Sequence, residues 1–142
     1  MGQDIHVWIE YDKVDYTICP VQIYVPRDYD LFGLFKKYNR GIHERTSGHL
    51  PVNNPDYHSW SYISLNELED IATQYLQSQY PSAKALDIFH LPTVYSDLRI
   101  AAMGAELERY HYSLIHLGIC ISVMIYLDAS GYNPRLIYCF DN

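Results

Sequence analysis

The sequence has little cysteine, little positive charge and no long apolar run. Its cysteines are Cys19, Cys120 and Cys139 and include no C-x-x-C pair, so we interpret them as reduced core residues of a cytosolic protein. Lysine and arginine number 10 against 17 acidic residues, a net charge of −7, and this argues against general nucleic-acid binding, which needs a basic surface. The sequence contains neither a signal peptide nor an apolar stretch of transmembrane length, which predicts no membrane partner.

Familiar catalytic motifs are missing as well. The sequence contains no G-x-S-x-G, no H-E-x-x-H and no H-x-H pair, so neither a hydrolase elbow nor a zinc-protease helix is predicted. Glycine-rich phosphate loops are also absent. Any phosphate would therefore be held by side chains or by a helix N-terminus. The lack of these motifs favours a binding protein over an enzyme but does not exclude an enzyme. It implies no cofactor.

What the sequence does contain is a strand with an unusual polar face near its start. Residues 4–11 alternate, with Ile5, Val7 and Ile9 on one side, because successive strand side chains face opposite sides of a sheet. The apolar side predicts core. The other side carries, in one row, Asp4, His6, Trp8 and Glu10. We take this row as the candidate site.

The strand pattern predicts two hairpins. Residues 16–25 would pair with the first strand to form an N-terminal hairpin, in which Pro20 indicates an edge strand or a bulge. The strongly β-type residues 119–127 and the closing strand at 135–140 would form a C-terminal hairpin.

Helical patterns occupy much of the chain between these hairpins. Residues 31–38 form a predicted helix with Asp28 or Asp30 as N-cap. A second helix, over 64–79, opens with a capping box made by Ser64 and Glu67. Further helical patterns are a short turn over 81–89 and a helix over 93–116. The prediction is a single α+β domain over residues 1–142, with one mostly antiparallel sheet and about three helices packed on one face.

A long loop is predicted over residues 40–60, and loops of this length are often functional. Three of the seven histidines, His43, His49 and His58, lie in it. Half of the 10 lysines and arginines lie within a short part of the chain, where they would form either a patch that holds a small anion or a solvated helix end. These five are Arg27, Lys36, Lys37, Arg40 and Arg45.

Four short stretches together resemble a family of small bacteriophage and prophage proteins. They are a G-x-D-I-H start at residues 2–6, an R-x-Y-D-L-F motif at 27–32, an H-S-x-S-W-like segment at 58–62 and an F-D-N end at 140–142. Gln3 replaces the usual cysteine. The resemblance implies a phage-encoded accessory protein that acts in a bacterial cytoplasm. It also implies that the polar residues of these stretches form one cluster, namely Asp4, His6, Arg27, Tyr29, Asp30, His58 and Asp141.

These observations lead to a hypothesis of binding rather than catalysis. The protein would be a phage accessory factor, with a counter-defence role, that captures a small polar or nucleotide-like ligand. Trp8 and Tyr29 would stack on the ligand, and Arg27 would hold an anion. The full predicted ligand-binding set is Asp4, His6, Trp8, Arg27, Tyr29, Asp30, His58, Trp60 and Asp141.

Two alternatives stay open. One is a metal-dependent hydrolase that uses Asp4, His6, Glu10 and His58. The other is an acidic inhibitor that binds a host protein. Exposed tyrosines or an edge strand would also allow the chain to form a homo-oligomer.

Overall fold

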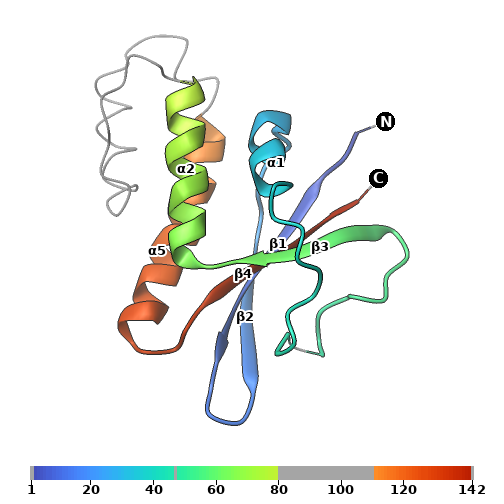
Figure 1. Cartoon of the computed structure of the whole chain (residues 1–142), viewed down its shortest axis with the longest axis vertical. Coiled ribbons are helices and arrows are strands. Elements are labelled where there is room, and N and C mark those ends of the chain that lie inside the picture. The colour runs from blue at the N-terminus through green and yellow to red at the C-terminus, as the bar shows by residue number, and fades with distance from the viewer. Residues whose placement is uncertain (1, 47, 80–110, 142) are drawn as a thin grey trace.

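Four strands and three helices make up the part of the chain that the computed structural model describes, residues 2–46, 48–79 and 111–141. The predicted turn at 81–89 and most of the predicted helix at 93–116 lie outside these residues. The elements, in chain order, are β1 (Ile5–Asp12), β2 (Thr17–Ile23), α1 (Tyr29–Phe35), β3 (Tyr57–Ile63), α2 (Leu65–Gln79), α5 (His111–Ala129) and β4 (Arg135–Asp141) (Figure 1).

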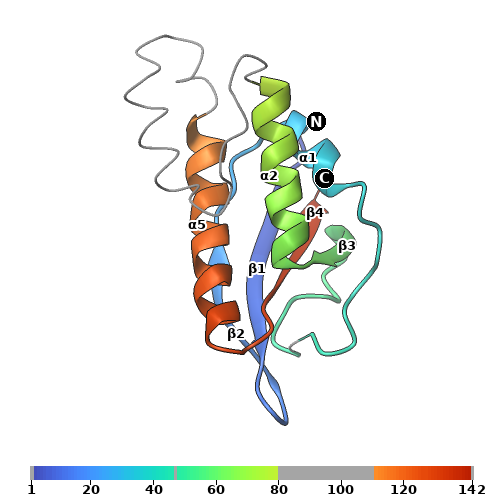
Figure 2. The same ribbon diagram turned by 60° about the vertical axis from the view of Figure 1, so that its left-hand side comes forward.

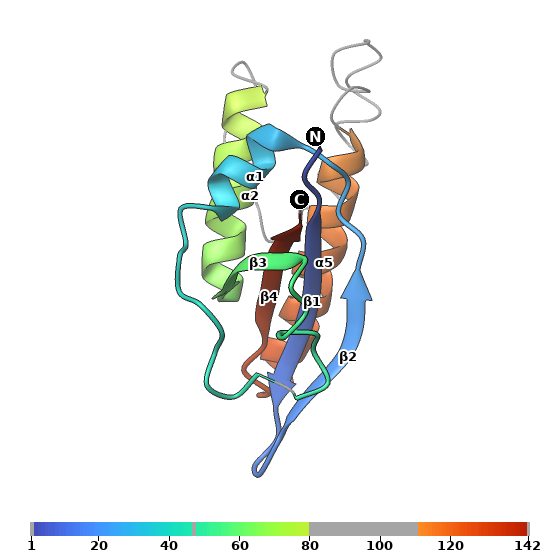
Figure 3. The same cartoon turned by 90° about the vertical axis from the view of Figure 1, so that its right-hand side faces the viewer.

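The strands form one antiparallel sheet in the order β2-β1-β4-β3. The two central strands, β1 and β4, come from opposite ends of the sequence and pair from Ile5↔Phe140 to Glu10↔Arg135. Because they run antiparallel, the start of β1 lies beside the end of β4. The two ends of the chain therefore lie at the same end of the sheet, next to each other on its central strands (Figure 3).

The helices cover one face of the sheet, as the sequence predicts, and α2 and α5 lie side by side over it (Figure 2). Ile5, Val7 and Ile9 of β1 point into the main core on that face. The opposite face carries a smaller apolar cluster of Trp8, Leu50, Trp60, Ile137 and Cys139. The α+β prediction with one mostly antiparallel sheet is therefore confirmed.

Local signals placed the first two helices well. The Asp28 carboxylate accepts a hydrogen bond from the Leu31 amide, which makes Asp28 the N-cap of α1. The Ser64 hydroxyl accepts from the Glu67 amide, and the Glu67 carboxylate accepts in turn from the Ser64 amide. This reciprocal pair is the predicted capping box.

The predicted C-terminal hairpin is wrong. Residues 119–127 lie inside helix α5, with Gly118 in its interior, and β4 pairs with β1 and β3 instead. A short, continuously apolar run does not distinguish a buried strand from a buried helix by its period. Here the buried positions follow helical spacing, at Leu117, Cys120, Ile121, Met124 and Leu127. None of the three described helices has both the length and the apolar character that a bilayer crossing needs.

The predicted loop at 40–60 was also too long, because β3 begins at Tyr57. The pairing between β3 and β4 is interrupted between His58 and Ser61 by a bulge, in which Ser59 has a φ of +57°. A bulge breaks the alternation of side chains along a strand, and this hides the strand from a pattern-based prediction.

Candidate functional site

The four stretches that carry the resemblance meet around the short segment ahead of β1. Arg27 donates two hydrogen bonds to the Asp4 carboxylate, from Nε to Oδ1 at 2.9 Å and from Nη2 to Oδ2 at 3.1 Å. The Gln3 amide donates to the Tyr29 hydroxyl at 3.2 Å, and the Gln3 side-chain amide lies 3.4 Å from His58 Nε2. The Asp4 amide donates to the Asp141 carboxylate at 2.9 Å. We call this set of residues the N-terminal cluster.

Gly2 makes room for the arginine. A Cβ atom at this position would lie 1.9 Å from Arg27 Nη1 and 2.3 Å from its Cζ. The guanidinium therefore lies directly against the Gly2 main chain, and any larger residue there would push it away from Asp4.

His6 also belongs to the N-terminal cluster, because it is hydrogen-bonded to Asp141. His6 Nε2 lies 2.7 Å from Asp141 Oδ2, and the two side chains are only 23% and 26% exposed. The hydrogen bond from His6, assisted by the Asp4 amide, lowers the pKa of Asp141 below its usual value. An ionised Asp141 can accept a hydrogen bond from His6 Nε2–H.

This pair could orient a base, but in the described part of the chain no nucleophile is hydrogen-bonded to it. Within residues 2–46, 48–79 and 111–141, no hydroxyl or thiol is hydrogen-bonded to His6. Its ring instead packs against Tyr57, with ring centroids 4.6 Å apart. The geometry therefore suits recognition of a polar group better than nucleophilic catalysis.

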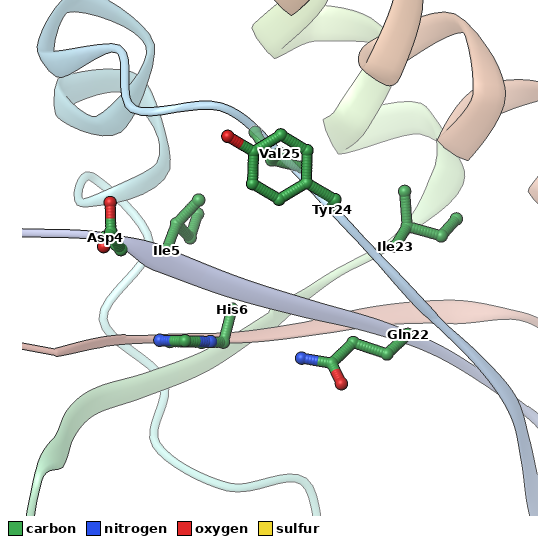
Figure 4. Close-up of a pocket in the computed structure, with 7 residues that line it drawn as sticks. All are labelled: Asp4, Ile5, His6, Gln22, Ile23, Tyr24 and Val25. Atoms are coloured by element: carbon green, nitrogen blue, oxygen red, sulfur yellow. The ribbon is translucent and has the colours of Figure 1, made fainter.

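A pocket of about 360 Å³ opens beside the cluster, between β1 and β2. Its lining residues are Asp4, Ile5, His6, Gln22, Ile23, Tyr24 and Val25 (Figure 4). The close-up shows these side chains leaving both faces of the two strands, so the pocket is an opening between the strands rather than a groove on one face. We call it the inter-strand pocket.

The inter-strand pocket combines apolar and polar walls. Ile5, Ile23 and Val25 are at most 8% exposed and belong to the main core. Figure 4 shows the polar wall opposite these residues, where the Gln22 amide points toward the His6 ring. The Tyr24 ring is 71% exposed beside the opening, where it lies edge-on to His116 with ring centroids 5.4 Å apart. An apolar lining with a few polar groups and an accessible aromatic ring is typical of small-molecule sites.

Two aromatic residues of the predicted ligand-binding set, Trp8 and Trp60, are buried. The rings of Trp8 and Trp60 stack on each other with centroids 5.5 Å apart, and the residues are only 7% and 8% exposed. Both lie in the smaller apolar cluster with Leu50. The prediction that they line a ligand site was therefore wrong, because the loop before β3 supplies apolar side chains that cover this part of the sheet.

Two predicted acids lie away from the cluster. Glu10 is fully buried and accepts a hydrogen bond of 2.9 Å from Arg135. Asp30 accepts from Gln79 on α2. With Glu10 held elsewhere, the four residues of the metal hypothesis do not gather, and no group of three or more potential metal ligands is found among the described residues.

The predicted basic patch is likewise divided. Arg40 pairs with Glu67, and Arg45 pairs with Asp12. Only Arg27 and Lys36 reach the N-terminal cluster, where Lys36 Nζ donates to the Gln3 side chain and lies 4.8 Å above the Phe140 ring.

No pattern in the sequence indicated that Gln22 and Tyr24 line a pocket. The predicted strand ran to residue 25, which would have continued the pairing with β1 beyond Ile23 and left no opening. The one local signal is Pro26, which has no amide proton to donate to a ladder.

Comparison of the chain with protein-family models, curated proteins and solved structures gave no match.

Proposed function

We propose that this protein binds a small polar, nucleotide-like ligand in the inter-strand pocket and does not act on it chemically. The observation that carries the proposal is the meeting of an apolar wall, an exposed ring and oriented polar groups around one opening. Its volume of about 360 Å³ lies within the range usual for ligand pockets, roughly 300–1,000 Å³.

Each side chain has a role that its surroundings allow. Tyr24 offers the exposed ring face, and takes the part that the sequence assigned to Trp8. His6 and Gln22 supply polar atoms that read the edge of a planar ligand. Arg27 engages Asp4 through Nε and Nη2 and packs Nη1 against Gly2, so binding of an anionic group of the ligand by Arg27 would compete with its pairing to Asp4.

The charges around the pocket limit the ligand. Asp4 and Asp141 bring two carboxylates, which Arg27 and His6 already engage. A ligand with several phosphates would face both acids with little unengaged positive charge. We therefore expect a nucleoside or a monophosphate to bind better than a triphosphate.

Isothermal titration calorimetry with uridine, adenosine and their mono- and triphosphates tests the proposal. Tyr24→Ser should weaken binding of the preferred compound at least ten-fold, because it removes the stacking face. Tyr126→Ser is the matched control, since Tyr126 on α5 is also 71% exposed. Absence of heat with every compound, or equal loss in both variants, would refute a nucleotide-like ligand at this pocket.

A second pair of variants examines the polar wall. Gln22→Ala should weaken binding, whereas Gln77→Ala, an exposed glutamine on α2, should not. Unchanged affinity in Gln22→Ala would remove that residue from the site but leave the role of Tyr24 standing.

The phage setting and the counter-defence role belong to the same proposal, and they are supported by the four resembling stretches alone. In this view the protein sequesters a nucleotide-like signal in the bacterial cytoplasm. Expression in a bacterium that restricts a phage through such a signal should restore plating, and Tyr24→Ser should abolish the effect. Self-association and a host protein partner stay predictions, which light scattering and pull-down from host lysate test.

A further inference from the structure

The main chain of β1 carries an unpaired stretch at the inter-strand pocket. The ladder between β1 and β2 begins at Val7↔Ile23 and continues through Trp8↔Gln22 toward the hairpin turn. Upstream of Val7 the two strands separate. Figure 4 shows the segment at Tyr24 and Val25 lying across the opening from Ile5.

The direction of the unpaired groups follows from the pairing on the other side of β1. The Asp141 amide donates to the Asp4 carbonyl at 3.0 Å, so the main-chain groups of Asp4 point toward β4. In an antiparallel ladder the hydrogen-bonding groups of successive residues point to opposite sides. Those of Ile5 therefore point away from β4, into the inter-strand pocket, as those of Val7 point toward β2.

Neither the N–H nor the C=O of Ile5 is hydrogen-bonded to any residue that the structure describes. Among the described residues, the ladder supplies no partner for Ile5 on the β2 side, and no other hydrogen bond there reaches its N–H or C=O. Ile5 is nevertheless only 5% exposed. An unpaired main-chain amide at a buried residue is unusual, because its loss of hydration costs about as much as a lost hydrogen bond. Water or a ligand in the open pocket must satisfy it, and a ligand that does so replaces that water.

The shape of the opening argues for a small ligand over an added strand. The Val7↔Ile23 pair closes one end, and at the other end Asp4, the last lining residue on this side, turns its main chain toward β4. Between these two ends only one residue of β1, Ile5, turns its main-chain groups into the opening. A peptide strand needs successive residues to pair with, whereas a planar ring needs one donor and one acceptor.

We infer that the N–H and C=O of Ile5 read the donor–acceptor edge of a nucleobase bound in the inter-strand pocket. In an extended residue these two groups lie side by side and point the same way, which is why residues facing each other in a ladder exchange two hydrogen bonds. A cyclic amide such as N3–H and O4 of uracil, or the amino and ring nitrogens of adenine, presents the complementary pair. The inference rests on the proposed function and specifies which part of the ligand is recognised.

Methylation of the ligand edge tests it. Calorimetry would compare uridine with 3-methyluridine, which lacks the N3 proton, and adenosine with N6,N6-dimethyladenosine. 5-Methyluridine, with its methyl group away from that edge, is the control. We expect the edge-methylated compound to bind at least ten-fold more weakly than its parent, and 5-methyluridine to match uridine.

Hydrogen exchange gives a second, residue-specific readout. In the free protein the Ile5 amide should exchange at least a hundred-fold faster than the Val7 amide, and a saturating nucleoside should slow it at least ten-fold. Binding that tolerates edge methylation, or an Ile5 amide already as protected as Val7, would overturn the inference while the proposed function stood. If neither nucleoside binds, the proposed function and the inference both fail.

Discussion

Replacing Arg135 by methionine should destabilise the protein by about 3–5 kcal/mol, which is the usual effect of removing one partner from a buried ion pair. The Arg135 side chain is 6% exposed and donates to Glu10 at 2.9 Å, to Asp12 at 2.9 Å and to Thr17 at 3.3 Å. Glu10 is fully buried, so the variant leaves its carboxylate in the protein interior without the guanidinium. A domain of this size typically has about 5–15 kcal/mol of stability in total, so the loss would be easy to measure.

Urea denaturation followed by circular dichroism measures the change, with the slope of the transition checked for two-state behaviour. Arg40→Met is the control. Its ion pair with Glu67 has side chains 35% and 24% exposed, and pairs near the surface contribute only about 0–1 kcal/mol. A loss below about 1 kcal/mol in Arg135→Met would refute the account of Glu10 as a structural acid.

Three further predictions concern the pKa of Asp12, the burial of two cysteines and the contact between Gly2 and Arg27. Burial would raise the pKa of Asp12, but hydrogen bonds from Arg135 and Arg45 outweigh it and lower the pKa from 3.8 to about 2; this stabilising contribution should be complete above about pH 4 and be lost as the pH falls toward 2. Acid titration of Asp12→Asn should show a flatter stability profile in that window, and an unchanged slope would contradict the assignment. Burial raises the pKa of the Cys120 and Cys139 thiols to about 12, so Cys19→Ser protein should not react with DTNB at pH 8 until urea unfolds it; fast stoichiometric reaction of the folded protein would count against their burial. Gly2→Ala should displace the Arg27 guanidinium and weaken nucleoside binding several-fold with little change in melting temperature, and wild-type affinity in this variant would show that the Arg27–Asp4 pair does not shape the site.

Much of the sheet could be predicted because β1 alternates strictly. Ile5, Val7 and Ile9 face the main core as their period requires, and Asp28 and Ser64 cap their helices with local hydrogen bonds. The failures have physical causes. The run at 119–127 is apolar on every side, so its period could not separate strand from helix, and only its packing against the sheet decides the matter.

The candidate site was predicted in part. The polar ends of the four motif stretches do come together, at Asp4, His6, Arg27, Tyr29, His58 and Asp141. The roles of Trp8 and Glu10 were not predictable from their strand face. Trp8 is buried by a loop far along the chain. Glu10 accepts a hydrogen bond from Arg135, which follows it by 125 residues. The inter-strand pocket depends on where the β1–β2 ladder stops, at Val7↔Ile23, and apart from Pro26 no local pattern marks that point.

The most direct test of ligand binding is native mass spectrometry of the full chain, as purified and after incubation with a bacterial nucleotide and metabolite extract. The account predicts one retained small molecule of nucleoside or nucleoside-monophosphate mass in the wild type and in Tyr126→Ser, and its loss in Tyr24→Ser. A protein that stays bare in both samples would contradict the account, and the N-terminal cluster would then be a structural clasp between the two ends of the sheet.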